Sequence, residues 1–456
     1  MLAPGPERVE PWFGRSVALA ASAVVVGSPS DGDGGTANGL AHVFGDSKRG
    51  WRRVQRLQAA DPAWEDRFAQ AVAADKGRLV VGRDQADEGA ADAGAVTVFR
   101  RSGYHFRREA ELVPPAPGGG DGFGGAVAIS GLTIAVGAPR DDAAALDGGS
   151  VTLWTLRDQE WSLEAKLLPP NGASGDWFGS AVAVDGATLV VGAHGRDDRG
   201  SQSGAAYVYR RGRDGAWALD ASLLPDDLAP GDWFGFSVAV KGDRIAVGSP
   251  RDDTRGESAG AVRIYRRTAE GWQAERTLRP AEGSVTAWFG YALAMDGARL
   301  LVGMPGDDRS AESGGSASLY ERIGQEWSLR LVVAPEASLV DEMFGSTVAL
   351  GPELAVVGRL VTDDGPVESG RAWVFRLAGT PRKESAKDGS ENDAAGASKD
   401  RDPDEEIIGP PTASPNRAVH PPAPPKAAPP GVPSQGQAAH VGLQVRRLSA
   451  PPYAPA

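Results

Sequence analysis

The 456-residue chain contains no cysteine and only five histidines. Without cysteine it forms neither a disulfide scaffold nor a thiolate zinc site, and it has no cysteine nucleophile. It also lacks any run of about 18 apolar residues, the length that a membrane-spanning helix requires. Acidic residues outnumber basic ones by 60 to 48, and the net charge of −12 argues against sequence-independent nucleic-acid binding, which needs a basic surface.

Aromatic residues nearly disappear near residue 380. Thirty of the 31 lie before Thr380, and Tyr453 is the exception. The last 77 residues hold 15 of the 34 prolines, with nine basic and nine acidic side chains. Such a segment buries too little apolar surface to offset its conformational entropy. We therefore predict a folded domain at residues 1–379, which carries the whole net charge, and a disordered tail at 380–456 that is first charged and then rich in proline and alanine.

The predicted domain consists of seven sequence repeats of about 55 residues each. A phenylalanine followed by glycine, or by alanine in the second copy, marks each unit: Phe13, Phe68, Phe123, Phe178, Phe234, Phe289 and Phe344. A glycine that ends an apolar run keeps the same spacing: Gly27, Gly82, Gly137, Gly192, Gly248, Gly303 and Gly358. Another glycine starts a later strand-like run: Gly39, Gly94, Gly149, Gly204, Gly260, Gly315 and Gly370. The units begin near residues 12, 67, 122, 177, 233, 288 and 343.

Each unit predicts four short strands and no helix. In the fourth unit these strands are Ser180–Val184, Thr188–Gly192, Ala205–Tyr209 and Trp217–Leu223. The first two are joined by Asp185-Gly186, a hairpin signal. One such sheet cannot bury both of its faces, whereas seven arranged in a ring can. The sequence therefore predicts an all-β fold, a seven-bladed β-propeller of four-stranded blades.

The motifs also resemble the FG-GAP repeat, the blade of the integrin α-subunit propeller and of many bacterial surface proteins. The fourth unit shows the pattern in Phe178-Gly179, Ala181–Val184, Val191–Ala193 and Gly204–Tyr209. Family members often hold calcium between the first and second strands. Calcium needs six to eight oxygen ligands, and here that connection is too short and too poor in carboxylates, so we do not expect calcium at that position.

Acidic residues gather instead between the second and third strands. These seven loops contain 20 acidic and eight basic residues. Because connections alternate between the two faces of a propeller, these loops and the connections between blades should form one acidic face. Asp pairs recur there: Asp141 and Asp142, Asp197 and Asp198, Asp252 and Asp253, Asp307 and Asp308, and Asp363 and Asp364. Three interpretations stay open: the pairs stabilise turns together with neighbouring arginines, they hold a metal such as calcium, or they contact a partner.

Catalytic motifs are absent from the sequence. There is no Gly-x-Ser-x-Gly elbow and no Walker loop. Three histidines of the predicted domain fall at different points of the repeat: His42, His105 and His194. We expect His194 to be a solvated loop residue. We expect no catalytic residue and no cofactor, calcium being the one candidate.

The leading hypothesis is a non-enzymatic binding or adhesion propeller, monomeric, located outside the cell, in the periplasm or on a bacterial surface. Its acidic loop face would take a protein or glycan partner. One alternative is a carbohydrate-binding propeller with ligands between blades, where a recurrent aromatic such as Trp217 would form the platform. Another is a hydrolase or lyase that uses paired carboxylates.

The ends of the repeat array do not match. Leu2–Gly14 aligns with Leu167–Gly179, so the chain begins at the last residue of a fourth strand. The seventh unit ends with its third strand, Arg371–Arg376. We expect the missing strand to come from residues upstream of Met1, which would also carry a signal peptide that is not visible in Met1–Pro11, or from the tail segment Leu443–Pro452.

Overall fold

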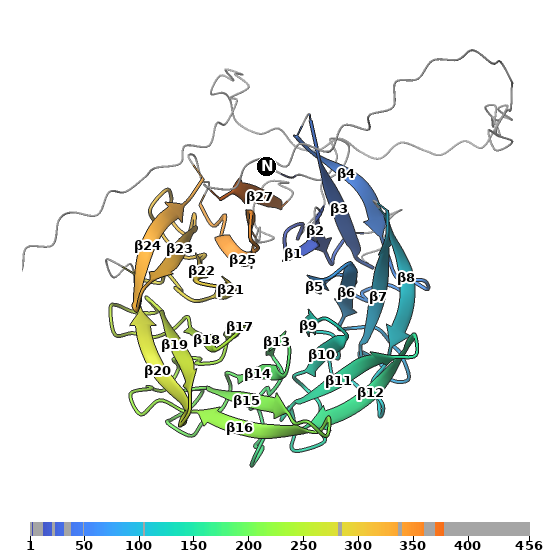
Figure 1. The fold of residues 1–456 in the computed structure, drawn as a ribbon, viewed down its shortest axis with the longest axis horizontal. Coiled ribbons are helices and arrows are strands. Elements are labelled where there is room, and N and C mark those ends of the chain that lie inside the picture. Colours follow the sequence, from blue (N-terminus) through green and yellow to red (C-terminus); the bar gives the residue numbers. More distant parts are fainter. Residues whose placement is uncertain are drawn as a thin grey trace, which may run out of the picture. The chain divides into compact units, whose positions relative to one another are not determined.

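The computed structural model describes residues 2, 12–20, 23–31, 38–48, 50–103, 105–280, 285–335, 340–359 and 370–377. These residues form 27 strands in seven sheets, arranged as a ring with the first strand of each sheet innermost (Figure 1). The prediction of an all-β, seven-bladed propeller is confirmed. None of the described segments is a helix long and apolar enough to cross a membrane. The predicted disordered tail, residues 380–456, lies outside the described residues.

The strands follow the chain blade by blade. Blade 1 contains β1 (Ser16–Ala20), β2 (Ala23–Ser28), β3 (Leu40–Ser47) and β4 (Gly50–Leu57). Blade 2 contains β5 (Ala71–Asp75), β6 (Arg78–Arg83), β7 (Ala95–Ser102) and β8 (His105–Leu112). Blade 3 contains β9 (Ala126–Ser130), β10 (Thr133–Ala138), β11 (Ser150–Arg157) and β12 (Glu160–Leu167). Blade 4 contains β13 (Ala181–Asp185), β14 (Thr188–Ala193), β15 (Ala205–Arg211) and β16 (Trp217–Leu223).

The remaining blades repeat the order. Blade 5 contains β17 (Ser237–Lys241), β18 (Arg244–Ser249), β19 (Ala261–Thr268) and β20 (Gly271–Leu278). Blade 6 contains β21 (Ala292–Asp296), β22 (Arg299–Met304), β23 (Ser316–Ile323) and β24 (Glu326–Val333). Blade 7 contains β25 (Phe344–Leu350), β26 (Leu354–Arg359) and β27 (Arg371–Arg376).

Neighbouring strands of each blade are antiparallel, and the first hairpin is tight. In blade 4 the register ends on the pair Asp185 and Thr188, which leaves a two-residue turn. Blades 1, 2, 3, 5 and 6 have the same turn length. A two-residue turn is too short to supply the six to eight ligands of a calcium ion by itself.

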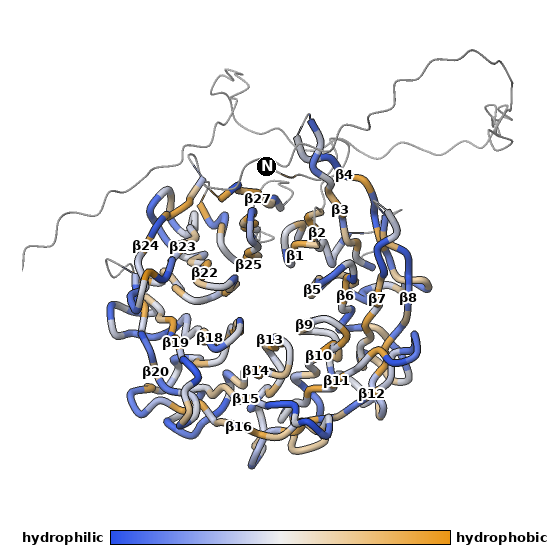
Figure 2. The backbone as a smooth tube through the Cα atoms, viewed as in Figure 1, coloured by the Kyte–Doolittle hydropathy of each residue, from blue (hydrophilic) through white to orange (hydrophobic). Residues whose placement is uncertain are grey.

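Apolar side chains concentrate in the inner strands, and the outer strands are more hydrophilic (Figure 2). The seven landmark phenylalanines all have 0% exposure. Phe178, for example, packs with Leu153 of blade 3 and with Val191 of blade 4. Each ring thus fills the wedge between two blades, where a large apolar side chain contributes about 2–3 kcal/mol on burial.

Two landmark glycines of each blade hold the Phe-Gly peptide of the next blade. A Cβ on the glycine that ends the second strand would lie 1.9–2.6 Å from the carbonyl oxygen of the next blade's Phe-Gly glycine, or of Ala69 in blade 2. A Cβ on the glycine before the third strand would lie 1.7–2.3 Å from the phenylalanine carbonyl. Only glycine permits this approach, which explains why both positions recur with the phenylalanine.

The recurrent outer-strand tryptophans connect neighbouring blades. Trp217 Nε1 donates to Glu164 of blade 3 (3.3 Å), and Trp272 Nε1 donates to Asp220 of blade 4 (2.9 Å). These carboxylates sit at a β-bulge that every complete outer strand contains. Trp217 is only 9% exposed. Its indole therefore serves the blade junction and is poorly placed as a sugar platform between blades.

The ring closes between blades 7 and 1. Thr347 Oγ1 donates to Gly14 O (2.8 Å), and Arg376 forms an ion pair with Asp46. Leu2 N donates to Ala372 O (2.6 Å), and Ala372 N donates to Leu2 O (3.2 Å). Leu2 therefore occupies the last position of blade 7's outer strand, as the alignment predicted. Within the described residues blade 7 otherwise has three strands, and Leu443–Pro452 lies outside them.

Candidate functional site

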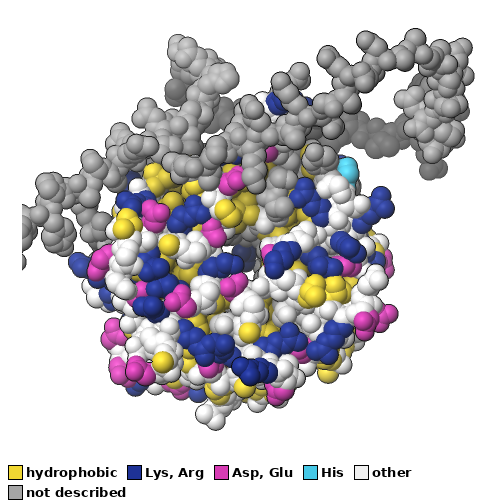
Figure 3. Space-filling view, in the orientation of Figure 1, with side chains coloured by type: hydrophobic (Ala, Val, Ile, Leu, Met, Phe, Trp, Pro, Cys, Tyr) yellow, Lys and Arg dark blue, Asp and Glu magenta, His cyan; other side chains and the backbone are white. Residues whose placement is uncertain are grey.

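The two long connections of each repeat lie on one face of the ring, which we call the loop face. Gly175, in the connection between blades 3 and 4, donates its N–H to Leu146 O in the second-to-third-strand loop of blade 3 (2.9 Å). Gly231 and Ser201 O repeat this bond one blade later (2.8 Å). Figure 3 shows one face of the ring, on which Lys and Arg side chains lie around the central opening together with Asp and Glu side chains. This face is therefore not uniformly acidic.

The first aspartate of most described pairs is buried. Asp141, Asp252 and Asp307 are 2–6% exposed. Asp141 Oδ1 accepts the Ala143 N–H (2.8 Å), and its Oδ2 accepts from Ser150 Oγ (2.5 Å) and Lys166 Nζ (2.6 Å). These bonds hold the loop on its own blade. The Asp141 oxygens are therefore already bonded within the blade, as are those of Asp252 and Asp307, so direct partner contact does not explain these three residues.

An exposed aspartate closes the loop between the second and third strands in blades 2–6. Asp142 Oδ1 accepts the N–H of Asp147, five residues on (2.7 Å). The same bond recurs from Asp87 to Asp92, Asp197 to Gln202, Asp253 to Ser258 and Asp308 to Ser313. In blade 4 the buried position that Asp141 holds in blade 3 is occupied by Arg196. The aspartate that accepts this bond is therefore Asp197, the first member of its pair. Asp198 instead pairs with Arg196 (3.0 Å). The pairs are therefore not equivalent from blade to blade.

The geometry of the Asp pairs favours turn formation over metal binding. Their oxygens accept hydrogen bonds from loop N–H groups, and no three acidic or histidine side chains converge on one point in the part of the chain that the structure describes. Asp363 and Asp364 lie outside that part. Asp141, Asp142, Asp197, Asp198, Asp252, Asp253, Asp307 and Asp308 thus lack the arrangement that calcium requires.

Four other buried aspartates were missed by the sequence reasoning. They stand two residues before the landmark phenylalanine and accept a backbone N–H three residues earlier: Asp66, Asp121, Asp176 and Asp232. Burial raises the pKa of the Asp232 carboxyl to about 6, with Asp252 and Asp253 adding to the shift. Asp176 instead pairs with Arg196 (2.7 Å). The repeated acidic residue at this position was the signal that could have found them.

Near the innermost strands of the loop face, equivalent positions carry different side chains. The residues just before the landmark phenylalanine are Trp12, Arg67, Gly122, Trp177, Trp233, Trp288 and Met343. The residues two positions after it are Arg15, Gln70, Gly125, Ser180, Phe236, Tyr291 and Ser346. Blades 5 and 6 are thus aromatic at both positions, blades 1 and 4 have tryptophan at the first position only, and blade 3 has glycine at both. The blade junctions are alike in all seven blades, so variation at these positions near the axis favours a binding role for them.

The aromatic residues form a continuous arc, which we call the aromatic arc. It runs through Trp177, His194, Trp233, Phe236, Tyr291 and Trp288, with neighbouring ring centroids 4.8–6.1 Å apart. Arg251 lies over the Trp233 ring at 4.5 Å. Three of the tryptophans have left-handed backbone angles, for example φ 53° at Trp177. Trp12, Arg67 and Met343 have the same conformation at the equivalent position, so it belongs to the repeat, and it costs about 1–2 kcal/mol for a bulky residue.

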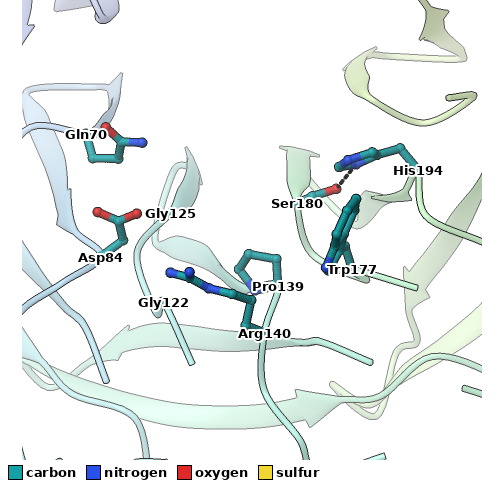
Figure 4. A pocket seen from close by; sticks show the side chains of 9 residues that line it. All are labelled: Gln70, Asp84, Gly122, Gly125, Pro139, Arg140, Trp177, Ser180 and His194. Atoms are coloured by element: carbon teal, nitrogen blue, oxygen red, sulfur yellow. Dashed lines mark hydrogen bonds between the residues drawn. The ribbon is translucent and has the colours of Figure 1, made fainter. Parts of the chain in front are cut away.

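A cavity of about 300 Å³, the axial pocket, lies where the aromatic arc meets blade 3 (Figure 4). Blade 2 contributes Gln70 and Asp84, blade 3 contributes Gly122, Gly125, Pro139 and Arg140, and blade 4 contributes Trp177, Ser180 and His194. The cavity exists because blade 3 has glycine at the two positions where blades 5 and 6 have Trp with Phe or Tyr. Gly125 does not have a positive φ, so its missing side chain is not explained by backbone conformation.

Two oxygens on the blade 2 side of the axial pocket lack hydrogen-bond partners. They are Asp84 Oδ1 and Gln70 Oε1, both buried. Asp84 is 8% exposed, and burial raises the pKa of its carboxyl while Arg67, Arg140 and Arg15 act in the opposite direction. Among the described residues none of these arginines has an ion-pair partner. A buried acceptor without a donor costs about 1–3 kcal/mol, which a bound ligand would recover.

On the opposite side of the pocket, Ser180 and His194 form a hydrogen bond of 2.8 Å between Oγ and Nδ1 (Figure 4). Burial lowers the pKa of His194 to about 4, so the imidazole is neutral at pH 7. The expectation of a solvated His194 is wrong, because Trp177, Trp233 and Phe236 pack around the ring. The position after Gly192-Ala193, where other copies have proline, was the signal that singled this residue out.

Comparison with protein families matches the FG-GAP repeat at residues 9–44, 51–99, 106–153, 161–209, 217–265 and 272–320. The matches cover more than half of the chain and fall in blades 1–6, in the register that the landmark phenylalanines define. No curated protein matches the sequence. The Phe-Gly junctions, the four-stranded blades and these six matches agree, and the chain belongs to the FG-GAP repeat family.

Proposed function

We propose that the protein is a non-enzymatic binding propeller that holds a glycan or protein partner at the centre of its loop face. The axial pocket carries this proposal. It combines two buried oxygens without donors, three arginines without ion-pair partners in the described residues and an aromatic wall. Pockets with an apolar lining and a few convergent polar groups are typical of ligand sites.

The Ser180 and His194 pair is the strongest feature in favour of an enzyme. A general base works best when its pKa lies near the working pH, and burial lowers the pKa of His194 to about 4. Within the described residues no carboxylate accepts a hydrogen bond from its imidazole, so the geometry lacks the third member of a catalytic triad. These observations support binding over catalysis.

FG-GAP repeats are typical of extracellular or surface proteins, and a loop face with an open binding pocket suits that setting. We propose that the protein acts outside the cytoplasm, as a monomer. Size-exclusion chromatography with light scattering tests the oligomeric state, and fractionation of the native host tests the location.

The binding role is tested by probing glycan arrays and arrays of secreted proteins with the labelled full chain. The test variant is Trp233→Ser, at the centre of the aromatic arc, and the matched control is Lys76→Ala, in a tight hairpin of the opposite face. We expect a ligand whose signal falls about tenfold in the first variant and is unchanged in the control. A ligand that is lost only in the Lys76 variant would contradict a loop-face site.

A further inference from the structure

We propose that the axial pocket binds an acidic sugar unit, a pyranose ring that carries a carboxylate. This inference rests on the proposed binding function and specifies the ligand. It follows from three properties of the pocket that lie on different blades: unsatisfied acceptors, unpaired positive charge and an aromatic wall.

The acceptors call for a ligand rich in hydroxyl groups. Asp84 Oδ1 and Gln70 Oε1 are buried and accept no hydrogen bond, and Asp84 is more than nine-tenths buried. Donors placed against both oxygens would remove the cost of leaving them unpaired. Adjacent hydroxyls of a sugar ring can each donate to one oxygen, because the two side chains lie next to each other on blade 2 (Figure 4).

The charge calls for an anion. Arg140 lines the pocket, and Arg67 and Arg15 lie near enough to Asp84 to influence its carboxyl. The single carboxylate of Asp84 faces the guanidinium groups of three arginines, so the positive charge exceeds the negative charge. Arg140 is also exposed. Guanidinium groups bind carboxylates through two parallel hydrogen bonds. A ligand carboxylate facing Arg140 would supply the missing partner.

The opposite wall calls for an apolar ring face. Trp177 and Pro139 line it, and the negative face of an indole attracts the polarised C–H groups of a sugar. The absence of side chains at Gly122 and Gly125 leaves room beside this wall. A simple cation would meet three arginines, and an inorganic anion would leave the wall and the two acceptors unused, so an acidic sugar fits the whole set best.

The test titrates the full chain with methyl glucuronide, methyl glucoside and inorganic phosphate, followed by calorimetry or ligand-observed NMR. We expect the glucuronide to bind about tenfold more tightly than the glucoside. Gly125→Tyr, which introduces the residue of blade 6, should abolish binding of both sugars. Arg140→Gln should remove the preference for the acid while the weak binding of the glucoside stays. Lys76→Ala should leave all three unchanged.

Equal binding of the two sugars, or glucuronide binding that survives Gly125→Tyr, would overturn the inference. Phosphate binding as tightly as the glucuronide would reduce the site to a general anion site and overturn it as well. If Gly125→Tyr fails to fold, the Arg140 variant still decides the role of charge. If neither sugar binds while an array ligand still depends on Trp233, the acidic-sugar inference fails and the proposed binding function stands.

Discussion

At the junctions between blades the seven copies use the same atoms, whereas around the axial pocket equivalent positions differ from blade to blade. Every landmark phenylalanine is fully buried, and every landmark glycine approaches a backbone carbonyl of the next blade. Near the axis, by contrast, the position of Gly125 is occupied by arginine, glutamine, serine, phenylalanine or tyrosine in other blades. The landmark positions that form the blade junctions accept only phenylalanine or glycine, whereas the positions near the axis accept different side chains and can therefore form a ligand site.

The sharpest test of this contrast uses two glycines of blade 3. In Gly137→Ala the new Cβ would lie 2.0 Å from the backbone oxygen of Gly179, so two blades must move apart. We expect a loss of about 3 kcal/mol or more, seen as a large fall in the melting temperature or a failure to fold.

Gly125→Ala is the matched control for that variant. Its Cβ would lie 3.2 Å from the nearest atom, Gly122 O, and would otherwise enter the axial pocket. We expect a change in stability below about 0.5 kcal/mol. Similar melting temperatures for the two variants would remove the distinction between junction and pocket positions.

A second test compares one substitution at equivalent aspartates. Burial raises the pKa of Asp232 to about 6 from 3.8, so the folded state binds more protons than the unfolded state between these pH values. Its stabilising effect is therefore present below about pH 4 and is lost as the pH rises through about 6. Asp232→Asn should raise the free energy of unfolding by about 1–2 kcal/mol at pH 7.5 and leave it unchanged near pH 4.

Asp176→Asn should act in the opposite direction. Asp176 pairs with the Arg196 guanidinium at 2.7 Å in a buried setting, and removing one charge of such a pair destabilises by about 2 kcal/mol or more. Urea unfolding of both variants at the two pH values checks the signs. A loss of stability at pH 7.5 in Asp232→Asn would mean that its carboxylate is compensated by a partner after all.

The smallest effect concerns the outer edge of the junctions. Trp217→Phe removes the indole donor to Glu164 and should cost about 1 kcal/mol. In the junction of blades 1 and 2 the aromatic is Phe106, and Gln55 instead bonds the Phe106 backbone (2.7 and 2.8 Å). Phe106→Trp should not raise the free energy of unfolding. The bulge position that is Glu164 in blade 3 is Val54 in blade 1, so the new indole N–H would have no acceptor there. If Phe106→Trp stabilised the protein by as much as Trp217→Phe destabilises it, the indole would act through packing alone.

The fold could be predicted because its determinants are local and repeated. The predicted strands of the fourth blade differ from β13–β16 by at most two residues at any end. The alignment of Leu2 with the end of a fourth strand was confirmed by its bonds to Ala372. Each of these inferences needed only the spacing of residues within one period, and seven copies supplied it.

The pocket could not be predicted in the same way. It joins Gln70, Gly125 and His194, which come from three blades, and it depends on Gly122 and Gly125, which no repeat landmark singles out. Counting charge located the acidic loops but not the use of their side chains. Asp141, Asp252 and Asp307 are buried in their own turns, whereas Asp142, Asp253 and Asp308 are exposed, so only part of the charge counted in these loops is accessible.

The aspartate that closes the loops of blades 2–6 has a practical consequence. Asp142 bonds an N–H five residues on within its own loop, and four other loops repeat this bond. The length between the flanking glycines is also constant along the chain. The conformation of such a loop is therefore set by bonds within the loop, between two landmark glycines at a fixed spacing. Exchanging loops between blades as cassettes would redesign the recognition surface while the ring beneath it stays the same.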